Sequence, residues 1–132
     1  YAIERFDKGI DLINENMNKF NVNNMTVIKS KAPEGMEELP ELDAVIIGGS
    51  AGGMTGIMDE AQRLLKVGGR LVVTAVTMET GYTILKELKG RPFTYEGYQM
   101  SISRYRKAGP YHLLDPLSPI FIVSATRIAE GE

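Results

Sequence analysis

The sequence has 132 residues, carries a formal net charge of −2 and is 43% hydrophobic, which suits one globular domain over residues 1–132. The slightly acidic balance argues against nucleic acid or anionic lipid as a partner bound through bulk charge. The absence of cysteine excludes disulfides and thiolate metal sites, and the single histidine, His112, excludes a histidine metal cluster.

The first residues predict a short buried strand, Tyr1–Glu4, that ends on an acid. A carboxylate at the tip of such a strand binds the ribose in nucleotide-binding α/β folds, so Glu4 is a candidate ligand. The alternative is a solvated acid, or one that pairs with Arg5 or Lys8. In such folds a strand and a glycine-rich turn come before this acid, and here nothing does. We therefore expect the first central strand of the sheet to be missing.

A helix is predicted from Asp7, its expected N-cap, to Phe20, because apolar residues recur there at helical spacing. Gly9 lies inside this helix and costs it about 1 kcal/mol relative to alanine. A short strand, Met25–Lys29, follows. The main chain of the next segment, Ser30–Glu34, could face the edge of an adenine, and the alternative is that its charged side chains are simply exposed.

A buried strand, Asp43–Ile47, leads into a run of glycines, Gly48–Gly53. The strand is rich in β-branched residues and lacks alternation, so both of its faces are expected to be buried. Glycines at the carboxyl end of a central strand let the backbone approach a flat ligand, and ligands of open α/β sheets bind at that end. The spacing matches neither a P-loop nor GxGxxG. The alternative is a flexible turn from strand to helix.

Three further elements continue the alternation of helices and strands. Thr55 is the expected cap of an amphipathic helix that ends at the turn Lys66–Arg70. A buried strand, Arg70–Val76, and a helix, Glu79–Lys89, come next. This alternation favours an α/β fold with a mostly parallel sheet.

The last third of the chain predicts two strands, Phe93–Tyr105 and Pro119–Thr126. Between them, Lys107–Pro119 is expected to be a polar loop, since it contains three prolines. No helical pattern separates the two strands, so we expect an antiparallel pair at the end of an otherwise parallel sheet.

Basic side chains gather at the end of the first of these strands. Arg104, Arg106 and Lys107 could bind a polyanionic substrate, because arginine suits carboxylates. The alternative is a polar edge strand that its charges protect against aggregation. His112 is expected to be a loop residue rather than a catalytic base.

Five stretches carry a family resemblance that runs over nearly the whole chain: Tyr1–Arg5 (YAIER), Asp43–Gly53 (DAVIIGGSAGG), Lys66–Thr77 (KVGGRLVVTAVT), Ser101–Arg104 (SISR) and Pro119–Ala125 (PIFIVSA). They resemble the decarboxylating precorrin or cobalt-precorrin carbon-15 methyltransferases of cobalamin biosynthesis. In many bacteria this module is the C-terminal half of precorrin-6Y methylase. YAIER and VGGRLV occur across class I methyltransferases, whereas the GGS run followed by AVTMET and SISR is more specific to this family.

The resemblance implies a Rossmann-like class I methyltransferase fold that binds S-adenosyl-L-methionine. It implies methyl transfer to carbon-15 of a tetrapyrrole (precorrin), coupled to decarboxylation of an acetate side chain. Family members are commonly homo-oligomers, so a dimer or tetramer is expected. The cofactor residues implied by position are Glu4 for the ribose, Lys31, Ala32 and Pro33 for the adenine, and Gly48 and Gly49 for the sulfonium and methionine portion.

Lys31 departs from the family, which usually has an aspartate at this position. An aspartate accepts the hydrogen bond of the adenine amino group, and lysine cannot. On the substrate side, Arg104 and Arg106 are candidates for holding the peripheral carboxylates, and Ser50 for lining the methyl-transfer pocket. Ser50 and Arg104 are the catalytic candidates, and no general base is identified.

The intact protein is therefore interpreted as this methyltransferase, and the 132 residues alone are expected to be inactive or to bind the cofactor weakly. One alternative is another class I methyltransferase, acting on RNA or on protein isoaspartate. Another is a non-catalytic fragment whose exposed strand edges drive oligomerisation. The longest apolar run is too short to span a bilayer, so a cytoplasmic protein without a membrane partner is expected.

Overall fold

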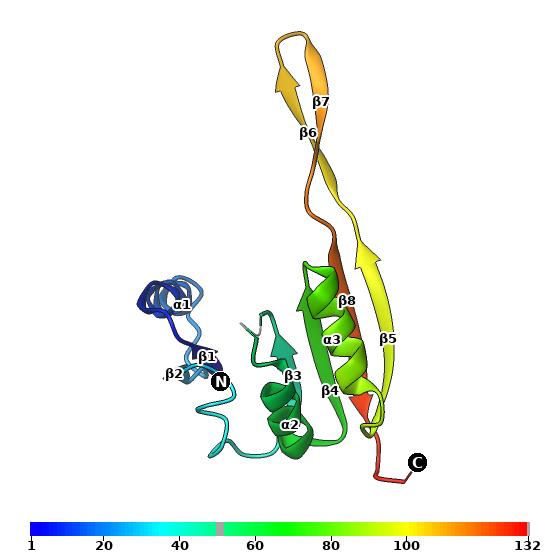
Figure 1. The fold of residues 1–132 in the computed structure, drawn as a ribbon. Helices are drawn as coiled ribbons and strands as arrows, with labels where there is room; N and C mark the ends of the chain where they lie inside the picture. The colour runs from blue at the N-terminus through cyan, green and yellow to red at the C-terminus, as the bar shows by residue number, and fades with distance from the viewer. Residues whose placement is uncertain (50–51, 132) are drawn as a thin grey trace.

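Helices and strands alternate along the first two thirds of the chain, as the sequence pattern predicts (Figure 1). The computed structural model describes residues 1–49 and 52–131. In chain order the elements are β1 (Ala2–Glu4), α1 (Asp7–Lys19), β2 (Val27–Lys29), β3 (Leu42–Ile47), α2 (Met54–Leu64), β4 (Leu65–Ala75), α3 (Met78–Leu88), β5 (Phe93–Met100), β6 (Ser103–Ala108), β7 (Tyr111–Pro116) and β8 (Ile120–Arg127).

The described strands form three separate ladders (Figure 1). β1 pairs with β2 in parallel. The main sheet has the order β3-β4-β8-β5, in which β3 and β4 are parallel and β8 runs antiparallel to both of its neighbours. β6 and β7 form a two-stranded antiparallel ribbon. The predicted mixed sheet with antiparallel strands at its C-terminal end is thus confirmed.

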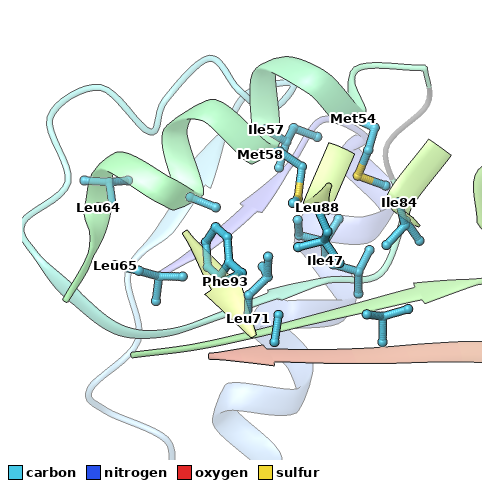
Figure 2. Packing of buried hydrophobic residues seen from close by; sticks show 14 of the residues in the cluster. Ile47, Met54, Ile57, Met58, Leu64, Leu65, Leu71, Ile84, Leu88 and Phe93 are labelled. Carbon is cyan, nitrogen blue, oxygen red and sulfur yellow. The ribbon is translucent and has the colours of Figure 1, made fainter. Parts of the chain in front are cut away.

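Helices α2 and α3 cover one face of the main sheet, and the hydrophobic core lies beneath them (Figure 1). Side chains alternate along β4, so Leu71 and Val73 point toward the helices and are fully buried. Met58 from α2 and Ile84 from α3 point back toward the strands and are also fully buried (Figure 2). Burial of each such side chain contributes about 1.5–3 kcal/mol. This layer therefore holds the sheet on which the candidate site is built.

The other face of β3 is open among the described residues. The Ile46 side chain is 77% exposed, whereas its neighbour Ile47 is 5% exposed and belongs to the core. The expectation that both faces of this strand are buried is therefore wrong for this structure. The physical reason is that α2 and α3 lie on the same side of the main sheet (Figure 1).

The segment after β5 differs most from the prediction. The expected single strand over residues 93–105 is interrupted between β5 and β6, and the expected loop over residues 107–119 contains β7. A two-residue turn, Gly109–Pro110, joins the paired residues Ala108 and Tyr111, and Gly109 has a φ of 60°. Glycine at the first central position is typical of a type II′ hairpin turn. We call the ribbon Ser103–Pro116 the arm, and it extends beyond the end of the main sheet (Figure 1).

Two predicted helix caps are also corrected. The N-cap of α1 is Phe6, which has no side-chain cap bond, while Asp7 is the first helical residue and forms an ion pair with Lys29 of β2. The N-cap of α2 is Gly53, and Thr55 lies inside the helix. Both differences are of one or two residues, which is the ordinary uncertainty of a helix end.

None of the helices in the described part of the chain combines the length and the apolar character that crossing a membrane requires. The longest described helix, α1, has 13 residues.

Candidate functional site

A hollow of about 580 Å³ lies between β1 and β3. Within the described residues β1 pairs only with β2, and β3 only with β4, so each strand has one edge without a ladder partner. The volume falls within the range of about 300–1,000 Å³ that is usual for small-molecule sites. The two unpaired edges bound part of this space, so the candidate binding site is the end of the hollow that Glu4, the loop after β2 and the Gly48–Gly49 turn line.

Five of the six predicted cofactor residues line this hollow, although they come from three separate segments. Glu4 ends β1, Lys31 and Ala32 lie in the loop after β2, and Gly48 and Gly49 follow β3. Strand ends and the turns that follow them are where ligands of open α/β sheets bind. The structure therefore brings these residues together around one space, as their positions in the sequence predict.

The Glu4 carboxylate is held against the start of α1. Its Oε1 accepts a hydrogen bond from the Phe6 backbone N–H at 2.8 Å. Glu4 forms no ion pair with Arg5 or Lys8 in the part of the chain that the structure describes. The carboxylate is thus fixed by the backbone rather than by a neighbouring cation, and a carboxylate oxygen retains further acceptor capacity for a ligand hydroxyl.

The loop after β2 is tied to β1 and turns toward α2. The Ser30 backbone N–H donates to the Glu4 carbonyl oxygen at 3.2 Å, which fixes the start of the loop beside the acid. Lys31 and Ala32 then face the hollow. Pro33 does not line it, because it packs against α2, where a Cβ added to Gly56 would lie 3.1 Å from the proline Cγ. The structure therefore separates Pro33 from the other predicted adenine residues.

The glycine pair after β3 faces open space. A Cβ built on Gly48 or on Gly49 would meet no described atom within 4 Å. At Gly48 neither packing within the described chain nor a positive φ requires glycine, whereas close approach of a ligand does; at Gly49 the φ of 157° itself favours glycine. Ser50, the predicted pocket residue that follows them, lies outside the described residues.

Apolar side chains that the sequence analysis did not single out complete the walls. Four of them are Phe6, Met36, Ile46 and Ile57. In the sequence, nothing marked these residues as parts of the site except their nearness along the chain to the predicted cofactor-binding residues. Apolar walls with a few polar groups are the usual composition of a site for an organic ligand.

The most connected carboxylate of the fold lies away from the hollow. Glu87 of α3 accepts hydrogen bonds from Thr55 of α2 and from Arg91, and so joins α2 to α3. These bonds lower the pKa of Glu87, and the bond from Thr55 has the larger effect. Its role is structural, because neither Glu87 nor its partners line the hollow.

The two predicted substrate arginines lie on the arm. Arg104 and Arg106 are two residues apart on β6, so they share one face of the ribbon, opposite Asp115 and Leu113 respectively. Neither lines the hollow, and neither forms an ion pair with another described residue. His112, expected in a loop, lies on β7, with its ring edge-on to Tyr105 at 5.9 Å between centroids. The structure thus does not bring the arginines to the hollow of their own chain.

The sequence of this chain is similar to one protein family and to several curated proteins. Residues 1–127 match the family described as the precorrin methyltransferase domain. A probable cobalt-precorrin-6B C(15)-methyltransferase (decarboxylating) of Sulfurisphaera tokodaii is 31% identical over 93% of this chain and 64% of its own length. The corresponding protein of Salmonella typhimurium is 31% identical over 96% of this chain and 65% of its own length. The chain thus spans somewhat less than two thirds of these curated relatives.

Several solved structures are also similar to this chain. The precorrin-6y C5,15-methyltransferase of Geobacter metallireducens has a TM-score of 0.88 and 31% identity, covering 96% of this chain and 67% of that one. A protein of Methanobacterium thermoautotrophicum described as precorrin 8w decarboxylase has a TM-score of 0.89 and 26% identity, covering 97% and 69%. An S-adenosylmethionine-dependent O-methyltransferase of Thermotoga maritima, at 21% identity and a TM-score of 0.76, covers 99% of this chain and 50% of that one and shares the fold. The predicted class I methyltransferase fold is thereby confirmed.

Proposed function

The chain belongs to the precorrin methyltransferase family, and on this premise we propose that its protein transfers a methyl group from S-adenosyl-L-methionine to carbon-15 of a precorrin or cobalt-precorrin and removes a carboxyl group as carbon dioxide. The observation that carries the proposal is the hollow between β1 and β3. It gathers Glu4, the loop after β2 and the Gly48–Gly49 turn around one space in a chain of this family.

The residues around the hollow fit an adenosyl cofactor. Glu4 offers a carboxylate for ribose hydroxyls, and the bare backbone at Gly48 and Gly49 has the open space that a methionine portion would fill. Phe6 and Ile57 offer apolar walls for the adenine. When bound, the cofactor supplies an activated methyl group on a sulfonium. The chain's own residues then bind it, orient it and exclude water.

Adenine recognition in this chain uses the backbone rather than the side chain at position 31. Lys31 lines the hollow but has only donors, so it cannot accept a hydrogen bond from the adenine amino group. The backbone carbonyl groups of the same loop are acceptors. We therefore propose that the main chain at Lys31 and Ala32 forms the hydrogen bonds to the edge of the adenine. The Lys31 ammonium group then stays exposed.

Arg104 and Arg106 are proposed to bind the peripheral carboxylates of the tetrapyrrole. They share a face of the arm, have no ion-pair partner among the described residues, and present the forked geometry that suits carboxylates. Ser50 is proposed to line the methyl-transfer pocket, since it follows the Gly48–Gly49 turn directly in the sequence. Catalysis then rests on alignment of the two reactants rather than on a strong general base.

We also propose that the protein is a homo-oligomer joined through the arm. Tyr105 and Leu114 lie opposite each other on one face and are 75% and 78% exposed, and Tyr111 and Leu113 are exposed on the other face. A two-stranded ribbon alone is marginally stable in water, and exposed apolar side chains with free strand edges favour association. A second copy brings an identical ribbon. Light scattering on the eluting full-length protein should give a multiple of the chain mass, and Leu114→Glu should reduce it; a wild-type monomer contradicts this assembly.

The activity is tested with the full-length protein, labelled S-adenosylmethionine and a precorrin-6B-type tetrapyrrole, with and without cobalt. The expected product has gained one methyl group and lost one carbon dioxide by mass spectrometry. Glu4→Gln should weaken S-adenosylhomocysteine binding about tenfold or more, because the neutral amide loses charged hydrogen bonds. Glu38→Gln, at an exposed loop residue that does not itself line the hollow, is the matched control.

The same activity assay distinguishes the two alternative functions that the sequence left open. Methylation of RNA or of isoaspartyl peptides, with no turnover of the tetrapyrrole, would replace the proposed reaction with one of those. Assembly without any binding of S-adenosylhomocysteine would make the chain an oligomerising module.

A further inference from the structure

Gly9 occupies an unusual place in α1. It is the third residue of a regular helix and has no positive φ, so its backbone conformation does not require glycine. Glycine is a poorer helix former than alanine at such a position. The reason for glycine here must therefore come from the space around its Cα.

That space is filled by the side chain of Glu4. A Cβ built on Gly9 would lie 2.7 Å from both Cγ and Cδ of Glu4, and 3.0 Å from its Oε2. Contacts this short do not occur between real atoms of this kind, so a side chain at position 9 and the present Glu4 conformation exclude each other. Glu4 and Gly9 are thus packed as one unit across the end of β1 and the first turn of α1.

A flexible side chain yields to such a clash more easily than a helix does. Any side chain at position 9 therefore leaves the fold in place and displaces Glu4. Displacement separates Oε1 from the Phe6 N–H, with which it now forms a 2.8 Å hydrogen bond, and re-aims the carboxylate at the edge of the hollow.

We propose that Gly9 is a positioning residue for the cofactor site: its missing side chain leaves the recess against which the Glu4 carboxylate is set. The expected effect on binding of the adenosyl ligand rests on the proposed function. The contact between the two residues stands on the geometry alone. The effect on binding passes through Glu4, so it must vanish when Glu4 is shortened.

The glycines around the hollow contrast with this one. A Cβ on Gly48 or Gly49 meets nothing within 4 Å in the described chain, so those glycines leave room for something outside it. Gly9 leaves room for a side chain of its own chain. Gly81 offers a matched control, since it lies within α3 and a Cβ there would be 3.7 Å from the Phe121 ring, an ordinary contact.

The test is a double-mutant cycle in the full-length protein with Gly9→Ala, Glu4→Ala and the double variant, and with Gly81→Ala as the control. Two quantities are measured: the dissociation constant of S-adenosylhomocysteine by calorimetry and the midpoint of thermal unfolding. In the wild-type background Gly9→Ala should raise the dissociation constant about tenfold or more, while helical circular dichroism stays unchanged. In the Glu4→Ala background it should leave the dissociation constant unchanged.

The unfolding midpoints provide a readout that needs no ligand. Gly9→Ala should raise the midpoint more in the Glu4→Ala background than in the wild type, because only there does alanine improve the helix without a clash. Gly81→Ala should raise it equally in both. Equal effects of Gly9→Ala in both backgrounds, on binding and on unfolding, would overturn the inference. Failure of the wild type to bind S-adenosylhomocysteine would refute the proposed function alone, and the unfolding cycle would still decide the coupling.

Discussion

The Thr55 hydroxyl of α2 donates a hydrogen bond of 2.6 Å to the Glu87 carboxylate of α3. The same carboxylate accepts from Arg91 at 2.8 Å, and Arg91 in turn pairs with Asp59 of α2 at 2.7 Å. These polar contacts join the two helices above the core of the main sheet. Protonation of Glu87 in acid should therefore weaken this link between the two helices.

Glu87→Gln should make the protein less sensitive to acid. The hydrogen bonds from Thr55 and Arg91 lower the pKa of Glu87 below its ordinary value of 4.5. A carboxyl with a lower pKa in the folded state contributes stability that is fully present above the unfolded pKa and is lost as the pH falls through the folded pKa. The wild type should therefore lose free energy of unfolding as the pH falls below 4.5 and through the lower pKa of folded Glu87, and Glu87→Gln should lose less over this range.

Urea unfolding at several pH values in this range measures the difference for this prediction. Glu38→Gln, an exposed loop variant, is the control and should follow the wild type. Parallel curves for Glu87→Gln and the wild type would show that the link between α2 and α3 contributes nothing in acid.

Ile84→Ala and Ile46→Ala form a matched pair that tests where the core lies. Ile84 of α3 is fully buried in the core, and its truncation should lower the free energy of unfolding by about 2–5 kcal/mol, because a cavity remains. Ile46 is 77% exposed on the open face of β3, so the same truncation should cost less than about 0.5 kcal/mol. Chemical denaturation of the two variants measures both values. A large loss for Ile46→Ala would mean that this face is covered in solution.

The positions of the strand ends were easier to predict than the C-terminal strands. Glu4, Ala32 and Gly48 lie around one hollow because each lies at or just after the end of a strand that its apolar residues indicate. Strand ends need only local information to be located. Side-chain direction needs the tertiary packing, which is why Pro33 was expected at the hollow although it packs against α2.

The arm was missed because its strands lack an apolar face of their own. β6 and β7 carry charged and polar residues between exposed tyrosines and leucines, and the prolines of this segment favour a loop. Gly109–Pro110 was the available signal, since glycine followed by proline between two extended runs suits a two-residue hairpin turn. Strands stabilised by a partner, rather than by their own core, leave a weak pattern in a single sequence.

Gly48→Val should separate cofactor binding from stability. The Cβ of the added side chain meets no described atom within 4 Å, so the free energy of unfolding should change by less than about 1 kcal/mol. The same side chain enters the hollow beside the turn, where the cofactor's methionine portion is proposed to lie. The dissociation constant of S-adenosylhomocysteine should therefore rise about tenfold or more. Unchanged binding by calorimetry would place the cofactor elsewhere.

Arg104 and Arg106 should affect the tetrapyrrole and not the cofactor. Arg104→Lys keeps the charge but loses the forked donor geometry, so the KM for the tetrapyrrole should rise about fivefold to tenfold, and Arg104→Ala should raise it further. Binding of S-adenosylhomocysteine should stay unchanged in both variants, because neither arginine lines the hollow. Arg70→Ala, at an exposed position of β4 away from the arm, is the control. If both arginine variants keep the wild-type KM, the arm serves assembly alone, since its charged face would then have no role in binding the substrate carboxylates.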